Sequence, residues 1–206
     1  LSISSAGIPS AMSKLISEYN ATGKIEAKTR AYKLSRKFIS YFSFATFILL
    51  FVFAEELGSL ILGDLQGGNT ITDVAFVIRC VSFAVLIVPH LSVAKGYLQG
   101  HEYVGPSSTA NLIEQVVRIF VILAGSYLCY KVLNGSLTLT IGIAVSGAFF
   151  GGLVAYYYLK RQINKNKKVL DLDKKLEKDD ISNKEIIKKI AIYAVPAIVL
   201  NLISSV

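Results

Sequence analysis

The chain has 206 residues, of which 53% are hydrophobic and only 17% charged, and its mean hydropathy is +0.53. Soluble domains carry about 25% charged residues, so this composition argues against an ordinary soluble domain and against a disordered chain. It fits a chain that spends most of its length in lipid.

The formal net charge is +8, from 22 Lys and Arg against 14 Asp and Glu. The basic residues are concentrated, with seven in residues 14–37 and eleven in residues 160–189. Two basic blocks beside long apolar runs are typical of the cytoplasmic connections of a membrane protein. No aromatic residue is interleaved with the second block, which argues against nucleic acid as a partner.

Apolar segments long enough to cross a membrane, or parts of such segments, recur along the whole chain. A spanning helix needs about 20 mostly apolar residues. The segments are 1–13, 38–54, 74–94, 107–130, 132–159 and 190–206. They predict an all-α, polytopic membrane helix bundle of about six transmembrane helices, in which the first is the end of a truncated helix.

The connections alternate in charge in the way that membrane topology requires. Residues 54–73 contain four acidic residues and no Lys or Arg, whereas 14–37 and 160–189 are basic. Under the positive-inside rule the first, third and fifth connections are cytoplasmic. The connection 160–189 is interpreted either as a solvated linker or as a surface helix with an apolar stripe (Val169, Leu172 and Leu176) on anionic lipid.

The apolar segments contain prolines and rows of small residues. Pro9, Pro89 and Pro196 fall inside spans, either as passive kinks or as bending points of a transporter. In 132–159, small residues recur every four positions in two rows, Gly147–Gly151–Ala155 and Ala144–Ala148–Gly152. Such rows let helix backbones approach closely, so they predict packing and not chemistry.

Ionisable residues inside spans are costly and therefore mark candidate functional sites. Asn111, Glu114, Gln115 and Arg118 follow the i, i+3, i+4, i+7 spacing that places them on one helix face. Arg79 is expected at a similar depth on the preceding, antiparallel helix.

Two interpretations of these charges stay open. In the first, Glu114 neutralises Arg118 or Arg79, and the pair only holds the bundle in register. In the second, two arginines against one glutamate leave surplus positive charge facing a wet cavity. Because the Arg fork donates two parallel hydrogen bonds, such a patch would bind phosphate.

The sequence offers little support for an enzyme. His90 and His101 have no Cys, Asp or His at ligand spacing, and no hydrolase or metalloprotease motif is present. We therefore expect no catalytic residue, no metal site and no cofactor.

Four stretches together resemble a known family. GIPSAMSKLISEYNATGK is similar to the second helix and first cytoplasmic loop of polysaccharide flippases in the MOP superfamily (multidrug, oligosaccharidyl-lipid, polysaccharide). Their fourth helix is similar to the stretch VIRCVSFAVLIVPHLSVAKGYLQG, and their fifth helix is similar to PSSTANLIEQVVRI. The basic stretch 160–189, after the sixth helix, resembles their interlobe linker. The most similar branch is the group of stage V sporulation protein B and MurJ-type lipid II flippases. Lys95 and Asn111 depart from the family pattern, which usually has Arg and Gln at these positions.

The resemblance implies a domain organisation. Residues 1–159 would form a MOP/MATE-like N-terminal transmembrane lobe with helices two to six. Residues 160–189 would be the basic cytoplasmic interlobe linker, and residues 190–206 the start of the seventh helix.

The resemblance also implies a function: a multi-pass protein of the bacterial cytoplasmic membrane that flips a lipid-linked oligosaccharide for cell-wall or polysaccharide synthesis. The substrate would be lipid II or another undecaprenyl-pyrophosphate-linked saccharide, and the implied partners are this substrate and membrane lipids, with a coupling cation left open. The expected substrate-binding residues are Arg79, Lys95, Asn111, Glu114, Gln115 and Arg118.

Two other functions compete with this one. A cation-coupled multidrug exporter of the same superfamily predicts an acidic cavity in this lobe. A non-transporting membrane scaffold predicts that changes at Arg79, Glu114 and Arg118 alter assembly and leave transport unaffected.

Overall fold

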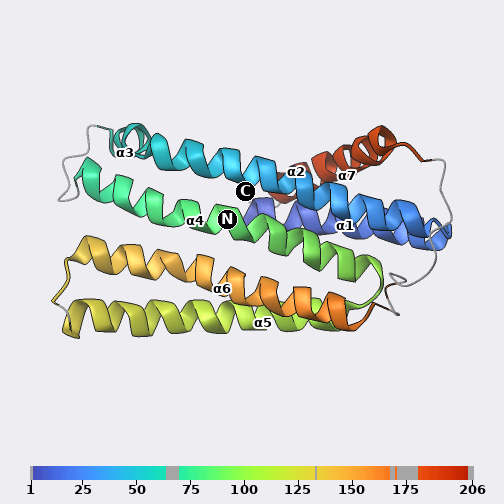
Figure 1. Ribbon diagram of the computed structural model, residues 1–206. Coiled ribbons are helices and arrows are strands. Elements are labelled where there is room, and N and C mark those ends of the chain that lie inside the picture. The colour runs from blue at the N-terminus through green and yellow to red at the C-terminus, as the bar shows by residue number, and fades with distance from the viewer. Residues whose placement is uncertain (1, 64–69, 133, 168–169, 171–180, 204–206) are drawn as a thin grey trace. The chain divides into compact units, whose positions relative to one another are not determined.

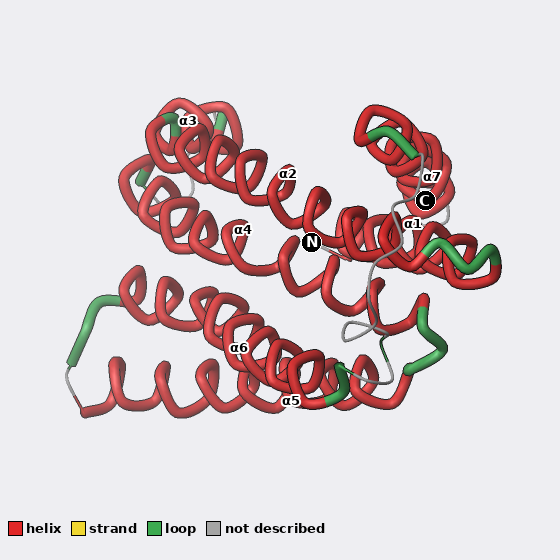
Figure 2. Tube along the Cα trace, turned by 45° about the vertical axis from the view of Figure 1, so that its right-hand side comes forward, coloured by secondary structure: helices red, strands yellow, loops and turns green. Residues whose placement is uncertain are grey.

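The computed structural model describes residues 2–63, 70–132, 134–167, 170 and 181–203. Within these ranges every regular element is a helix and no strand occurs (Figure 2). The prediction of an all-α fold is therefore confirmed.

The helices follow one another along the chain (Figure 1). Their bounds are α1 Ser2–Ala21, α2 Ile25–Val52, α3 Ala54–Leu62, α4 Ile71–Gly100, α5 Val104–Phe120, η1 Val121–Gly125, η2 Leu128–Val132, α6 Leu137–Lys165 and α7 Asn183–Ile203. The two segments labelled η are π-helical turns that continue α5.

Four stretches of the described chain are long and apolar enough to cross a membrane: Ile25–Val52, Ile71–Gln99, Val104–Val132 and Leu137–Lys165. They contain the predicted segments 74–94 and 107–130 and most of the predicted segments 38–54 and 132–159. The predicted partial spans at the two ends fall in α1 and α7. Together these helices make the chain a multi-pass membrane protein.

The helices extend further than the apolar segments do. Helix α2 begins at Ile25, so part of the first basic block lies on the same helix as the span that follows. Helix α6 continues to Lys165 and α7 begins at Asn183, which shortens the connection expected at 160–189 from both ends. The suggested apolar stripe of Val169, Leu172 and Leu176 lies outside the described residues.

The acidic connection at 54–73 contains a helix that the sequence analysis treated as part of a loop. Helix α3 begins after Phe53, where the chain leaves α2 in a turn. Ala54 and Gly58, one turn apart, are its buried residues. A β-carbon on Gly58 would lie 3.3 Å from the Ile71 carbonyl oxygen, so α3 packs closely on the start of α4.

The prolines stand where the sequence predicts them. Pro9, Pro89 and Pro196 lie inside α1, α4 and α7. Pro106 lies in the first turn of α5, where a missing N–H leaves no intrahelical bond unmade.

The chain divides into two compact units. The first combines residues 1–40, 89–111 and 156–206. Its core includes the buried Leu15, Ile16 and Tyr19 of α1. Gly96 and Gly100 of α4 bring the α1 backbone close, because a β-carbon at Gly96 would lie 2.5 Å from the Pro9 carbonyl oxygen.

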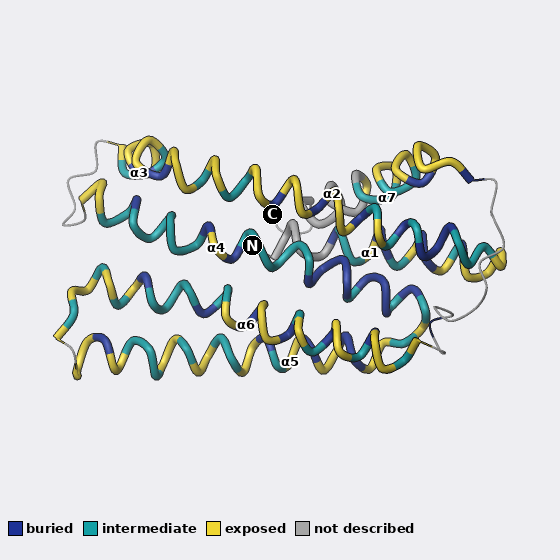
Figure 3. The backbone as a smooth tube through the Cα atoms, in the orientation of Figure 1, coloured by how far each residue is buried: buried dark blue, intermediate teal, exposed yellow. Residues whose placement is uncertain are grey.

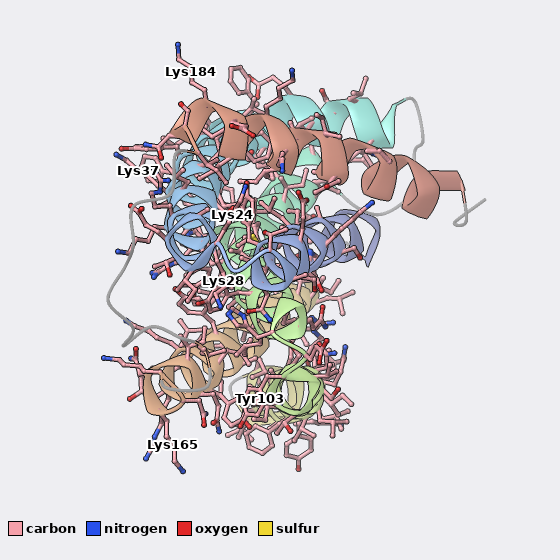
Figure 4. The ribbon with its side chains drawn as sticks, turned by 90° about the vertical axis from the view of Figure 1, so that its right-hand side faces the viewer. Lys24, Lys28, Lys37, Tyr103, Lys165 and Lys184 are labelled. Atoms are coloured by element: carbon pink, nitrogen blue, oxygen red, sulfur yellow. The ribbon has the colours of Figure 1, made fainter. Side chains whose placement is uncertain are left out.

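A group of polar side chains joins α1 to α7 inside this unit. The Lys189 ammonium donates to Glu18 Oε1 at 2.6 Å, and the Tyr193 hydroxyl donates to Glu18 Oε2 at 2.7 Å. Lys14 lies over the Tyr193 ring at 4.6 Å from its centroid. Elsewhere in this unit, Lys165 and Lys184 point away from the helices that carry them (Figure 4).

The second unit combines residues 41–88 and 112–155. In it α6 lies between α4 and α5 (Figure 1), and the two small-residue rows of α6 face these different neighbours. A β-carbon at Gly151 would lie 2.6 Å from the Glu114 carbonyl oxygen of α5, and one at Gly152 would lie 3.0 Å from Ile87 of α4. The packing interpretation of the rows is therefore confirmed.

Candidate functional site

The charged residues of α5 form a close ion pair. Arg118 Nη2 donates to Glu114 Oε1 at 2.6 Å. The two residues are four positions apart, which stacks their side chains on one helix face. The Glu114 side chain is only 12% exposed and that of Arg118 is 30% exposed. The sequence spacing thus predicts this contact correctly.

The glycines of α6 make room for the pair. A β-carbon at Gly147 would lie 3.5 Å from Arg118 Cγ, and one at Gly151 would lie 3.5 Å from Arg118 Cβ. Larger side chains on this face of α6 would compete with the arginine for space. The packing row and the charged pair therefore belong to one local arrangement.

Arg118 retains hydrogen-bonding capacity beyond Glu114. Its Nε is buried and, among the described residues, has no hydrogen-bond partner. A buried donor without an acceptor is costly, and an arginine fork binds carboxylate or phosphate oxygens best through two parallel bonds. The arrangement is suited to a second, anionic acceptor.

Arg79 lies against a different carboxylate. Its Nη2 donates to Glu55 Oε1 at 3.0 Å, and its Nε donates to the Phe51 carbonyl oxygen at 3.4 Å. The sequence predicts Arg79 at a depth similar to that of Arg118, either paired with Glu114 or sharing a basic patch with Arg118. In the structure the two arginines have separate ion-pair partners, Glu55 on α3 and Glu114 on α5.

The remaining candidates differ in exposure and position. Asn111 and Gln115 are exposed on α5. Lys95 is half-buried on α4, and its carbonyl oxygen accepts a hydrogen bond from Ser107 Oγ at 3.1 Å. Lys95 and Asn111 belong to the first compact unit, and the other four candidates belong to the second.

The sequence reasoning missed Glu55 as a partner. One signal in the sequence points to this pair: Glu55 lies just outside one predicted span, and the next predicted span contains Arg79. Among the described residues no group of three His, Cys, Asp or Glu is placed to hold a metal ion.

Comparison with known proteins gives a consistent family signal. The profile of a family described as polysaccharide biosynthesis protein matches residues 1–206. The lipid II flippase MurJ of Bacillus subtilis (strain 168) is 37% identical over 161 residues, which are 76% of this chain and 30% of that protein.

A second relative from the same organism, named uncharacterized membrane protein YabM, is 29% identical over 202 residues, which are 98% of this chain and 35% of that protein. The chain thus spans about a third of the length of the curated relatives it matches. No solved structure matches it.

Proposed function

The chain belongs to the polysaccharide biosynthesis protein family, and we propose that the protein moves a lipid-linked sugar precursor across the cytoplasmic membrane. Lipid II or a related undecaprenyl-pyrophosphate-linked saccharide is the proposed substrate. The similarity to a lipid II flippase over three quarters of the chain supports this substrate class. The protein would act as a transporter and not as an enzyme.

The observation that carries the proposal is the state of Arg118. This arginine lies inside a candidate span, pairs with Glu114 through Nη2, and has a buried Nε without a hydrogen-bond partner among the described residues. A diphosphate-sugar headgroup cannot cross hydrocarbon unaided, because it would lose its water and counterions. An arginine that donates hydrogen bonds to phosphate oxygens would replace part of both.

In this mechanism Glu114 holds the Arg118 side chain in place while the site is empty. When a pyrophosphate enters, its oxygens accept hydrogen bonds from the guanidinium N–H groups of Arg118 that Glu114 does not use. Gln115, which belongs to the same compact unit as Arg118, would donate neutral hydrogen bonds to the headgroup. Arg79 of this unit would add positive charge if it leaves Glu55. Two lobes that rock around such a midplane site would expose it to each side in turn.

The test separates binding from structural pairing. Arg118→Ala, Glu114→Ala and the double variant are made in the full-length protein. Precursor flipping and the amount of folded protein in the membrane are then measured. If Arg118 binds pyrophosphate, the double variant restores folded protein but transport stays about tenfold or more below normal, since a charged hydrogen bond contributes about 1.5–3 kcal/mol. Arg118→Lys should recover part of the transport.

Lys131→Ala is the matched control, because it removes an exposed positive charge from the same continuous helical stretch. It should leave transport unchanged. Full transport by the charge-balanced double variant would make the Glu114–Arg118 pair purely structural and would remove the physical support for the proposal.

A further inference from the structure

Helix α3 turns away from the direction of the spanning helix that precedes it. In Figure 1, α3 is seen nearly end-on where α2 runs across the view. The change of direction occurs at Phe53, and α3 and the adjoining part of α2 lie in one compact unit. Helix α3 thus lies across the end of a membrane span.

Eight of the nine residues of α3, all but Leu62, divide into three faces. Ala54 and Gly58 are buried toward the protein. At the helical spacing of 3.6 residues per turn, Leu57, Leu60 and Ile61 form an apolar face, and Glu55, Glu56 and Ser59 form a polar face. Leu60 is 80% exposed and Ile61 is 64% exposed, as the colouring of α3 in Figure 3 reflects.

An open groove of about 660 Å³ lies between α3 and the end of α2. Its lining consists of Leu49, Phe53, Glu56, Leu57, Ser59 and Leu60. Leu49 belongs to the membrane-spanning stretch of α2 and is itself exposed, as are its neighbours Ile48 and Val52. The groove therefore continues the lipid-facing surface of α2 onto α3.

Arg79 fixes the corner between α2 and α3. Its guanidinium bonds the Glu55 carboxylate of α3 and the Phe51 carbonyl of α2, and it lies 5.8 Å from the centre of the Phe51 ring. Long arginine side chains in spans extend toward the water boundary. The Arg79–Glu55 pair therefore marks the level of that boundary, with the apolar face of α3 beside it.

We propose that α3 is an interfacial helix, and that its apolar face and the adjoining groove bind phospholipid acyl chains. The leaflet is the one opposite the basic connections, since residues 54–73 contain no Lys or Arg. The occupant is lipid because the groove is continuous with the lipid-facing side of α2 and four of its six lining residues, Leu49, Phe53, Leu57 and Leu60, are apolar. This inference does not depend on the proposed transport function.

The experiment uses the absence of tryptophan from these 206 residues. Leu60→Trp places an indole on the apolar face, and Thr72→Trp places one at an exposed position in the first turn of α4, outside the groove, as the control. Any tryptophan elsewhere in the full-length protein is replaced by phenylalanine. The protein is reconstituted in vesicles of phosphatidylethanolamine and phosphatidylglycerol, with bromine either near the headgroup end or near the methyl end of the acyl chains.

Bromine near the headgroup end should quench most of the fluorescence of Leu60→Trp, and bromine near the methyl end should quench less of it. Iodide in the water should quench it only weakly. Thr72→Trp should be quenched more by iodide. Ile61→Trp should repeat the Leu60→Trp result, so that one poorly folding variant does not decide the outcome. Equal iodide quenching of Leu60→Trp and Thr72→Trp would overturn the proposal. Shielding of Leu60→Trp from both iodide and bromine would also overturn it, because a protein surface would then cover α3.

Discussion

Gly151 of α6 lies so close to Glu114 of α5 that a β-carbon on the glycine would stand 2.6 Å from the Glu114 carbonyl oxygen. The contact is with backbone, which cannot move aside as a flexible side chain can. The close approach of α6 also sets the space in which Arg118 lies. Helix packing and the placement of the charged pair therefore depend on the same glycines.

This relationship predicts a graded series of substitutions. Gly151→Ala should destabilise the protein by about 1–3 kcal/mol, the usual cost of overfilling a packed interface. Gly147→Ala should cost less, because its β-carbon would lie 3.1 Å from the Arg118 carbonyl oxygen. Gly147→Leu should strongly reduce the amount of folded protein. Thermal unfolding in detergent, followed by size-exclusion chromatography, measures the order.

Gly105→Ala is the control for this series, because nothing lies within 4 Å of the β-carbon it would add. It should leave the unfolding temperature unchanged or raise it slightly, since alanine has a higher helix propensity than glycine. If Gly151→Ala and Gly105→Ala unfold alike, α6 does not pack on α5 as described.

Membrane topology gives a second prediction. With Cys80 and Cys129 replaced by alanine, single cysteines at the exposed positions Thr22, Thr72 and Lys167 are treated with a membrane-impermeant thiol reagent. Thr22→Cys and Lys167→Cys should react from the cytoplasmic side, and Thr72→Cys from the opposite side, because three spans separate Thr72 from Lys167. Reaction of Thr72→Cys and Lys167→Cys from the same side would contradict the topology.

The α1–α7 contact gives a third prediction. Glu18→Gln should weaken the hold of α1 on α7, because the carboxylate accepts hydrogen bonds from both Lys189 and Tyr193. Hydrogen exchange of the backbone amides at 186–193 should then become faster. Lys188→Gln, which changes the exposed neighbour of Lys189, is the control and should leave the exchange as it is. Equal exchange in both variants would show that the pair does not hold α7.

The same contact should depend on pH, which makes a fourth prediction. The hydrogen bond from Lys189 lowers the pKa of Glu18 below its ordinary value of 4.5. The stabilisation is therefore present above pH 4.5 and is lost as the pH falls through the lowered pKa. The hydrogen bond to Glu18 raises the pKa of Lys189 above 10.5, so on the alkaline side the contact is lost only as the pH rises through that raised value. Protection of the amides at 186–193, expressed relative to the intrinsic exchange rate at each pH, should be greatest between the two limits.

The sequence predicted the parts of the fold that depend on local spacing. The long apolar runs identify the four spanning stretches, and the four-residue interval identifies the Glu114–Arg118 contact, because both follow from the pitch of one helix. The small-residue rows on α6 were recognised for the same reason. Only the structure shows that one row faces α5 and the other faces α4.

The sequence did not predict features that depend on distant residues. Helix α3 has nine residues, too few for a span, so it was treated as part of an acidic connection. The sequence does not reveal the partner of Arg79. Counting residues along the helix gives only the depth of its backbone in the membrane, whereas its side chain reaches Glu55, which is 24 positions earlier in the chain. Gly96 and Gly100 admit α1 against α4, and because α1 is distant in sequence, their spacing alone does not reveal this contact.

The π-helical turns at Val121–Gly125 and Leu128–Val132 have a consequence for how related sequences vary in length. A π-turn closes its hydrogen bond over one more residue than an α-turn does. Removing one residue from 121–132 can therefore convert a π-turn into an α-turn, and the helical hydrogen bonds before and after the deletion are kept. Removing one residue from 104–120 would instead rotate Glu114 or Arg118 about 100° around the helix, away from the glycines of α6. Gaps between related sequences should accordingly collect in 121–132.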